Sequence, residues 1–438
     1  MTSTACAQRV LVIGAYGLIG YGIAKQLQAD GHDITGLGRN AQTATRVIPE
    51  ISWVFRDIRS LIDAEHWDPL VRDASVVVNC SGALQDGPED DLEAVHHHAV
   101  AALAKACRAN DVTLIQISAV GARLDSNLPF LSSKARGDAA IKASGVGYHI
   151  FRPGLVLAPS AYGGTAMLRM LAAIPMVQPL ALPQSQIQTV SLMDVAAAVG
   201  AAVSGKIPVG FEADLVEATP HSLRDLVASV RRWMWFDGAR FEVVLPPGLV
   251  AVTCKVADAL AYLGWRSPLR TTAFEVLTKG VKGTPTDMTR YGLSPVMSLP
   301  RTLSAMPARA EDRLFARMLL LMPLMIMTLS VFWLASGIIG LFQINQAALT
   351  LETVGWPHAF AASSVAFWAV IDIGIALGLL VRKYAPLACW ATVAVSLFYL
   401  GASTVLVPGL WIAPLGPMVK VIPGIVLALV TRIALENR

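Results

Sequence analysis

Three glycines near the start of the chain are spaced for phosphate binding. Gly14, Gly17 and Gly20 lie in RVLVIGAYGLIGYGIAKQL, where a strand-like apolar run leads directly into a helix-like one. In such a turn one glycine permits the sharp bend, one lets the backbone approach a pyrophosphate, and one lets the helix pack closely on the sheet. The helix would also direct its N-terminal amides at the phosphates. The pattern predicts a dinucleotide site, which also includes Tyr16, Leu18 and Ile19.

The second apolar run, HDITGLGRN, ends in Arg39. An NAD-selective site carries an acidic residue at this point to bind the ribose 2′-hydroxyl, whereas a guanidinium suits a 2′-phosphate. The sequence therefore favours NADP(H) over NAD(H), and an ordinary surface arginine is the alternative interpretation.

Small and polar residues follow the next two apolar runs. Asp57 comes shortly after WVF, and Ser81 and Gly82 follow the strand in ASVVVNCSGAL. The carboxyl ends of parallel strands meet at one edge of a sheet, where such cofactors bind. We therefore expect all three residues to line the same cofactor site.

Three consecutive histidines, His96, His97 and His98, invite a metal interpretation. Successive residues of an α-helix point about 100° apart, so three in a row cannot converge on one ion. We interpret them as the start of a helix after the fourth strand and predict no metal site.

Strand-length apolar runs alternate with amphipathic helical segments up to about residue 310. This order predicts an α/β fold, with a Rossmann-type doubly wound parallel sheet over residues 1–210 and a small substrate lobe and linker over residues 211–310. Within the lobe, LPPGLVAVTCKVADALAYLGW has an amphipathic period. We interpret it as a lobe helix, with contact to a membrane surface as the alternative.

Residues 311–438 have a different composition. The whole chain is 54% hydrophobic and 15% charged, which is too apolar for an ordinary soluble protein of this size. A helix of about 20 apolar residues crosses the core of a bilayer. We predict an all-α four-helix transmembrane bundle with spans at about residues 318–342, 359–381, 385–407 and 410–431.

Basic residues indicate the orientation of these spans because they favour cytoplasmic flanks. Basic residues occur before the first span, between the second and third spans, and after the fourth, whereas the other two loops carry none. They are Arg309, Arg313, Arg317, Arg382, Lys383, Arg432 and Arg438. We predict a multi-pass protein of the inner (cytoplasmic) membrane whose termini and nucleotide domain are cytoplasmic. The formal net charge of +4 requires no nucleic-acid partner.

Two charges, Asp372 and Lys420, fall within the predicted spans. Counting along each span places both within about 3 Å of the midplane, at a rise of about 1.5 Å per residue. Charges at this depth normally face a partner or a cavity. We predict that they form a pair, which is either structural or a polar site for a quinone-like headgroup or a proton.

The order of GAYGLIG, Asp57, NCSGA, LIQISAVGA, Lys134 and HIFRPGLVLAP resembles the short-chain dehydrogenase/reductase superfamily. It is most similar to the atypical extended group that includes the nucleotide-binding accessory subunit of respiratory complex I and quinone- and isoflavone-reductase-like proteins. The resemblance covers about residues 8–310. It implies that the glycines hold the pyrophosphate, Asp57 the adenine and Lys134 the nicotinamide ribose. It also implies site roles for Ser118, after the fifth strand, and for Arg152 and Pro153, after the sixth.

The membrane half has a resemblance of its own. FWLASGIIGL, VIDIGIALGLL and GPMVKVIPGIVLALV are similar to the DoxX-like four-helix family, over about residues 313–435. This resemblance implies an architecture more than a reaction.

The resemblance leaves the proton donor open. In that superfamily a tyrosine four residues before the lysine exchanges a proton with the substrate, and here that residue is Phe130. With Lys134 and Ser118 as catalytic candidates, we expect an oxidoreductase acting on a hydrophobic carbonyl or quinone in the bilayer. One alternative is a non-catalytic nucleotide-binding protein that supports a respiratory or lipid- or quinone-biosynthesis assembly, with membrane-protein partners. In another, the membrane helices carry the chemistry and the nucleotide domain regulates them.

Overall fold

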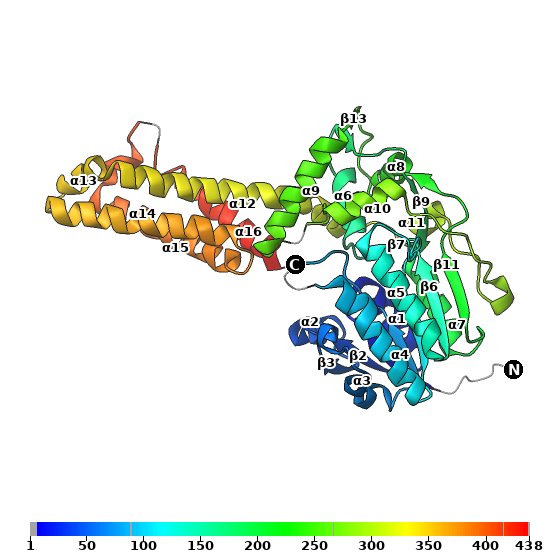
Figure 1. Cartoon of the computed structure of the whole chain (residues 1–438). Coiled ribbons are helices and arrows are strands. Elements are labelled where there is room, and N and C mark those ends of the chain that lie inside the picture. The colour runs from blue at the N-terminus through cyan, green and yellow to red at the C-terminus, as the bar shows by residue number, and fades with distance from the viewer. Residues whose placement is uncertain (1–6, 88–89, 266, 415, 437–438) are drawn as a thin grey trace. The chain divides into compact units, whose positions relative to one another are not determined.

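The computed structural model of the chain describes residues 7–87, 90–265, 267–414 and 416–436 (Figure 1). The chain divides into two compact units. The first comprises Met1–Asp258 and Ser267–Arg313, and the second comprises Ala259–Arg266 and Leu314–Arg438. Each unit is described below by itself.

A seven-stranded parallel sheet forms the centre of the first unit, in the order β11-β6-β5-β4-β1-β2-β3. The strands are β1 (Arg9–Ile13), β2 (Asp33–Gly38), β3 (Ser52–Phe55), β4 (Val76–Asn79), β5 (Thr113–Ile117), β6 (Tyr148–Pro153) and β11 (Phe211–Leu215). The order reverses between β1 and β4, and this switch point opens the crevice where ligands of such sheets bind. The predicted doubly wound sheet is confirmed, but it includes β11, beyond the expected boundary at residue 210.

Helices cover both faces of the sheet (Figure 1). α1 (Leu18–Ala29) and α7 (Leu192–Val203) share one core with Val10 and Val12 of β1. Leu11 and Ile13 of the same strand belong to a second core. That core includes residues of α3 (Ala64–Val71), α4 (Ala99–Ala109) and α5 (Pro129–Ser144). Alternate residues of a strand point to opposite faces, so β1 serves both cores.

The lobe is built from short paired strands and helices. The strand pairs are β7 (Leu155–Leu157) with β10 (Thr189–Ser191), β9 (Gln186–Ile187) with β12 (His221–Ser222), and β8 (Val177–Leu180) with β13 (Phe241–Val244). The helices are α6 (Gly164–Ala172), α8 (Leu223–Trp233), α9 (Pro247–Tyr262), α10 (Thr271–Lys279) and α11 (Leu299–Ala305). Arg169 of α6 pairs with Asp312 at 2.6 Å, which fastens residue 312 to the lobe.

Three helices of the second unit are long and apolar enough to cross a membrane: α12 (Ala310–Phe342), α14 (His358–Leu380) and α15 (Ala385–Leu406). They coincide with the first three predicted spans. A short helix, α13 (Ile344–Glu352), separates α12 from α14. The protein is therefore a membrane protein with an all-helical second unit.

The predicted fourth span, 410–431, is wrong as a single helix. Pro408–Trp411 form a 3₁₀ turn, η4, and α16 begins only at Val421 and ends at Glu436. Pro414 and Pro417 lie between them, and proline has no amide hydrogen to continue a helix. The helical part is thus 16 residues long and starts about three turns later than the hydropathy predicted.

The predicted pairing of Asp372 with Lys420 is also wrong. Asp372 is 3% exposed and accepts hydrogen bonds from the hydroxyls of Ser336 at 2.7 Å and Tyr399 at 2.9 Å. Lys420 is exposed in the turn before α16. Three helices therefore meet at the carboxylate, and two hydroxyls take the place of the expected cation.

Candidate functional site

The glycine turn between β1 and α1 is shaped for close approach of a ligand. Gly14 has a φ of +73°, in the left-handed region that glycine adopts without strain. A Cβ on Gly20 would lie 2.2 Å from the carbonyl oxygen of Gly14, so only glycine lets α1 pack this tightly on the turn. Leu18 and Ile19 occupy the first turn of α1 and pack against the core. This backbone fits the pyrophosphate of a dinucleotide at a helix N-terminus.

Tyr16 connects the glycine turn to the end of β2. Its hydroxyl accepts hydrogen bonds from the backbone amides of Arg39 at 3.2 Å and Asn40 at 3.3 Å. The ring lies over Gly38, where a Cβ would come within 2.3 Å of it. Tyr16 thus holds the backbone at the base of the Arg39 side chain, a role that the glycine spacing alone did not reveal.

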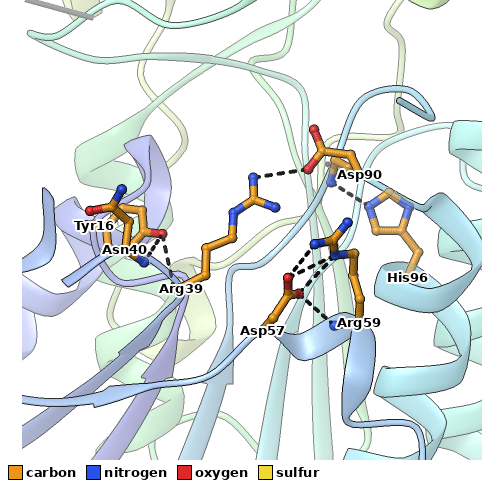
Figure 2. A network of polar contacts seen from close by, with 8 residues as sticks. Tyr16, Arg39, Asn40, Asp57, Arg59, Asp90 and His96 are labelled. Atoms are coloured by element: carbon orange, nitrogen blue, oxygen red, sulfur yellow. Dashed lines mark hydrogen bonds and ion pairs between the residues drawn. The ribbon is translucent and has the colours of Figure 1, made fainter. Parts of the chain in front are cut away.

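Two guanidinium groups stand at the carboxyl ends of β2 and β3 (Figure 2). Arg39 pairs with Asp90 at 3.2 Å, and both side chains are about one third exposed, at 36% and 31%. Arg59 donates to both oxygens of Asp57, with a shortest distance of 2.6 Å. These hydrogen bonds lower the pKa of Asp57, which also caps the short helix η1 (Ile58–Ser60).

The end of β4 is fixed by a buried amide. Asn79 donates to Gln116 at 2.9 Å and accepts from the amide and hydroxyl of Ser81, at 3.1 and 2.5 Å. Beyond Ser81, a Cβ on Gly82 would lie 3.3 Å from Nε2 of His96 and 3.6 Å from Nζ of Lys134. The predicted residues Ser81, Gly82 and Lys134 are therefore close together at the carboxyl edge.

Lys134 projects from α5 to the end of β5. Its ammonium donates to the carbonyl of Ile117 at 3.1 Å, and the residue is only 6% exposed. Burial lowers the pKa of Lys134, while the nearby Asp138 opposes that shift. Phe130 lies one helical turn before, with its ring centre 5.9 Å from the ammonium. The spacing of a Tyr-Lys pair is thus present with an aromatic ring that has no hydroxyl.

His96 is an unpredicted part of the same cluster. Its Nε2 accepts from the amide of Ala83 at 3.1 Å, and its Nδ1 lies 2.9 Å from the hydroxyl of Ser133. Because Nε2 accepts, Nδ1 must carry the proton and donate to Ser133. Burial and the charge of Lys134 hold the pKa of His96 well below its usual value. His96 is therefore neutral and positions the loop after β4 against α5.

Ser118, at the end of β5, belongs to a buried ionic network. Its hydroxyl donates to Asp138 at 2.8 Å, and the guanidinium of Arg152 reaches the same carboxylate at 3.3 Å. Arg152 also pairs with Glu212 at 2.6 Å. Burial raises the pKa of Asp138. The side chain of Arg152 thus lies within this network, and the buried Pro153 ends β6.

The three histidines require one correction. Ala94–His98 form a π-helical turn, η2, in which the ligand atoms of Glu93, His97 and His98 lie within 4.8 Å of one another. The argument from a 100° helical turn therefore fails for two of the three histidines. Arg136 donates to both oxygens of Glu93, which opposes a cation at this position.

Sequence reasoning missed His96 as a neutral hydrogen-bonding residue and missed Asp138 entirely. Asp138 stands four residues after Lys134 on α5, so it shares the helix face of Phe130 and Lys134. That spacing was a usable signal for a second titratable group at this edge.

Two family comparisons match separate parts of the chain. Residues 14–203 match a family described as NAD(P)H-binding, and residues 330–429 match the DoxX-like family. No curated protein matches the chain by sequence. The chain therefore joins an NAD(P)-binding Rossmann domain to a DoxX-like domain.

Solved structures share the fold of the first unit at low sequence identity. The NADPH-dependent quinone oxidoreductase QOR2 of Escherichia coli, solved with NADPH, is 18% identical, and the match covers 68% of this chain and 99% of that one with a TM-score of 0.51. The enzyme WbmG of Bordetella bronchiseptica, solved with NAD and UDP, is 16% identical over 70% and 94% of the two chains, with a TM-score of 0.49. A UDP-glucose 4-epimerase of Thermotoga maritima is 14% identical over 68% and 97%, also with a TM-score of 0.49.

Proposed function

Because the chain joins an NAD(P)-binding Rossmann domain to a DoxX-like membrane domain, we propose that it is an NADP(H)-dependent oxidoreductase of the cytoplasmic membrane. Its substrate is a hydrophobic carbonyl or quinone-type compound dissolved in the bilayer. The observation that carries this proposal is the buried ammonium of Lys134 at the carboxyl edge of the sheet, beside Gly82 and Ser118. Attachment to the membrane confines the enzyme to the phase that holds such a substrate and raises the effective concentration of both.

The position of Arg39 supports NADP(H) as the cofactor. It follows the last residue of β2, where the ribose of a dinucleotide is bound in this fold. Its guanidinium is about one third exposed and forms a surface pair with Asp90. A 2′-phosphate carries more charge than one carboxylate and is a stronger partner for a guanidinium.

The proton has to come from a group other than Phe130. The bound nicotinamide would supply the hydride, so the chain must supply one proton to the substrate oxygen. We propose Ser118 as the donor and Asp138 as its reservoir, since Ser118 hydrogen-bonds to Asp138 at 2.8 Å. The hydroxyl of Ser118 donates to the carboxylate of Asp138, and protonation of Asp138 would reverse this hydrogen bond, so that Asp138 would return a proton to Ser118 as Ser118 gives its own to the substrate. Burial raises the pKa of Asp138, which is the direction that this relay requires.

Turnover of reduced cofactor tests this function. The full chain, reconstituted in phosphatidylcholine vesicles, should oxidise NADPH when decylubiquinone is added, and Lys134→Met and Asp138→Asn should each slow this reaction by about two orders of magnitude. A rate unaffected by both substitutions would contradict the assignment of this edge as the active site. Arg72→Gln, at an exposed surface pair of α3, is the matched control and should react as the unchanged chain does.

The competing function is a non-catalytic nucleotide-binding subunit of a membrane assembly. Phe130 favours this non-catalytic function, because it stands where the superfamily has its proton-donating tyrosine and has no exchangeable proton of its own. In that case the chain binds NADPH without oxidising it, over a panel of quinones and carbonyls, and Phe130→Tyr does not change this. Gain of turnover in Phe130→Tyr, with unchanged NADPH affinity, would favour the enzyme.

A further inference from the structure

Helix α9 has two apolar faces, and only one of them is packed. Val250, Cys254 and Ala257 are buried at 5%, 0% and 7% exposure. A second row of apolar side chains is exposed, with exposed fractions between 41% and 60%. This row, which we call the apolar stripe, consists of Leu249, Val252, Val256 and Leu260. A helix that packs one face against its domain normally presents polar residues on the others.

The apolar stripe is narrow and continuous. Its members are three, four and four residues apart, and at about 100° per residue they fall within an arc of about 80°. Lys255 is exposed at one flank of the stripe, about 60° around the helix from Val252. The stripe runs along about 17 Å of the helix, at a rise of about 1.5 Å per residue. This is the pattern of a helix that lies at an apolar boundary on one side and contacts water on the other.

The strand that precedes α9 continues the exposed apolar surface. All four residues of β13 are exposed, and Phe241 and Val243 point to one side of the strand, at 65% and 45% exposure. Glu242 points to the other side, where Arg224 binds it at 2.6 Å. The polar residue of β13 is therefore satisfied by the protein, and its apolar residues are not covered.

The residues directly after α9 are fixed at the end of a membrane helix. The amide of Arg382 donates to the carbonyl of Leu263 at 2.9 Å, and the indole of Trp265 donates to the carbonyl of Leu380 at 2.6 Å. Leu380 ends α14, whose 23 residues span about 34 Å. A bilayer core is about 30 Å thick, so α14 is long enough to bring its last residue to the membrane–water boundary.

We propose that the apolar stripe, together with Phe241 and Val243, lies in the headgroup region of the bilayer. Because α9 ends at the level of that boundary, the lipid headgroups would cover the stripe if α9 lies along the membrane surface, and no other partner is needed. An upright helix would leave the stripe in water. This contact is independent of catalysis.

Hydroxyl-radical footprinting of the unchanged full chain tests the proposal in vesicles of phosphatidylcholine with a minority of phosphatidylglycerol. Leu249 is 55% exposed and Leu124 is 63% exposed, so the two leucines should react alike if both face water. Leu124 is flanked by the exposed ion pair of Arg123 and Asp125 and serves as the internal control. We expect Leu249 to react about tenfold more slowly than Leu124, because the headgroup region excludes most water. Equal rates would overturn the proposal.

A photoreactive benzophenone amino acid in place of Val252 identifies what covers the stripe. We expect covalent adducts with the lipids, and about tenfold fewer from the same group in place of Leu124, which is exposed between the charged side chains of Arg123 and Asp125. Adducts with a second copy of the chain, or with neither lipid nor protein, would overturn the proposal. If the substituted chain does not fold, the footprint of the unchanged chain still decides. NADPH affinity and turnover are separate readouts, so failure here does not affect the proposed function.

Discussion

Removing the guanidinium of Arg39 should change cofactor preference more than cofactor binding. A charge-assisted hydrogen bond to phosphate contributes about 1.5–3 kcal/mol. Binding of a 2′-phosphate must displace the pair of Arg39 with Asp90, which is 3.2 Å long and one third exposed. Such surface pairs contribute about 0–1 kcal/mol. The net loss in Arg39→Gln is then about 0.5–3 kcal/mol, or roughly a 2- to 150-fold rise in the Kd for NADPH.

The Kd for NADH should change by less than about threefold, because NADH has no 2′-phosphate for Arg39 to bind. Quenching of tryptophan fluorescence, titrated with both cofactors in the reconstituted protein, gives both constants. Arg72→Gln removes an exposed arginine of similar charge from α3 and should leave both unchanged. An equal weakening of NADPH and NADH would show that Arg39 supports the fold of the site without reading the 2′ position. An unchanged Kd for NADPH would refute the reasoning.

Three further substitutions test other parts of the structure. Gly20→Ala should weaken NADPH binding more than about tenfold and lower the Tm, because the added Cβ would overlap the carbonyl of Gly14. Gly238→Ala is the control and should change neither, because a Cβ there would have no atom within 4 Å. Lys134→Met should flatten the dependence of the free energy of unfolding on pH just below pH 10.5. Burial lowers the pKa of Lys134 in the folded protein, so in this range the unfolded chain binds more protons than the folded one. Stability therefore rises with pH when the lysine is present, and this rise is lost in the variant. Equal slopes of Tm against pH in both proteins would contradict this. Tyr399→Phe should destabilise the membrane unit by about 1.5–3 kcal/mol, because Asp372 loses a hydroxyl partner. Lys420→Gln, at an exposed position, should change the stability by less than about 0.5 kcal/mol. Thermal unfolding in vesicles measures both changes, and a larger loss in Lys420→Gln would show that the lysine is the partner of Asp372.

The sequence predicted the sheet and the glycine turn because their signals are local. The turn at Gly14 and the position of Arg39 depend on residues that follow one another along a strand, a turn and a helix. The hydrogen bond of Ser118 to Asp138 depends instead on how α5 packs beside β5. Likewise, His96 becomes an acceptor only where the loop after β4 passes the π-helical turn. Neither arrangement can be inferred from spacing alone.

The membrane half shows a second kind of limit. Hydropathy counts apolar side chains, and residues 410–419 are apolar, but it does not count the missing amides of Pro414 and Pro417. An apolar span also indicates that a charge such as Asp372 needs polar partners. Its partners depend on the rotation of α12 and α15 about their axes, which brings Ser336 and Tyr399 to the carboxylate.

The hydrogen bond between Trp265 and Leu380 also constrains the order in which the protein can be made. The two residues are 115 positions apart, and ribosomes add about 5–20 residues per second, so Trp265 is synthesised about 6 to 23 seconds before its partner. All seven strands of the sheet have been synthesised by then, since β11 ends at Leu215. The first unit can thus begin to fold while the segment at 259–266 still lacks its membrane helices. The hydrogen bond that fixes the segment after α9 therefore forms only after α14 has been made.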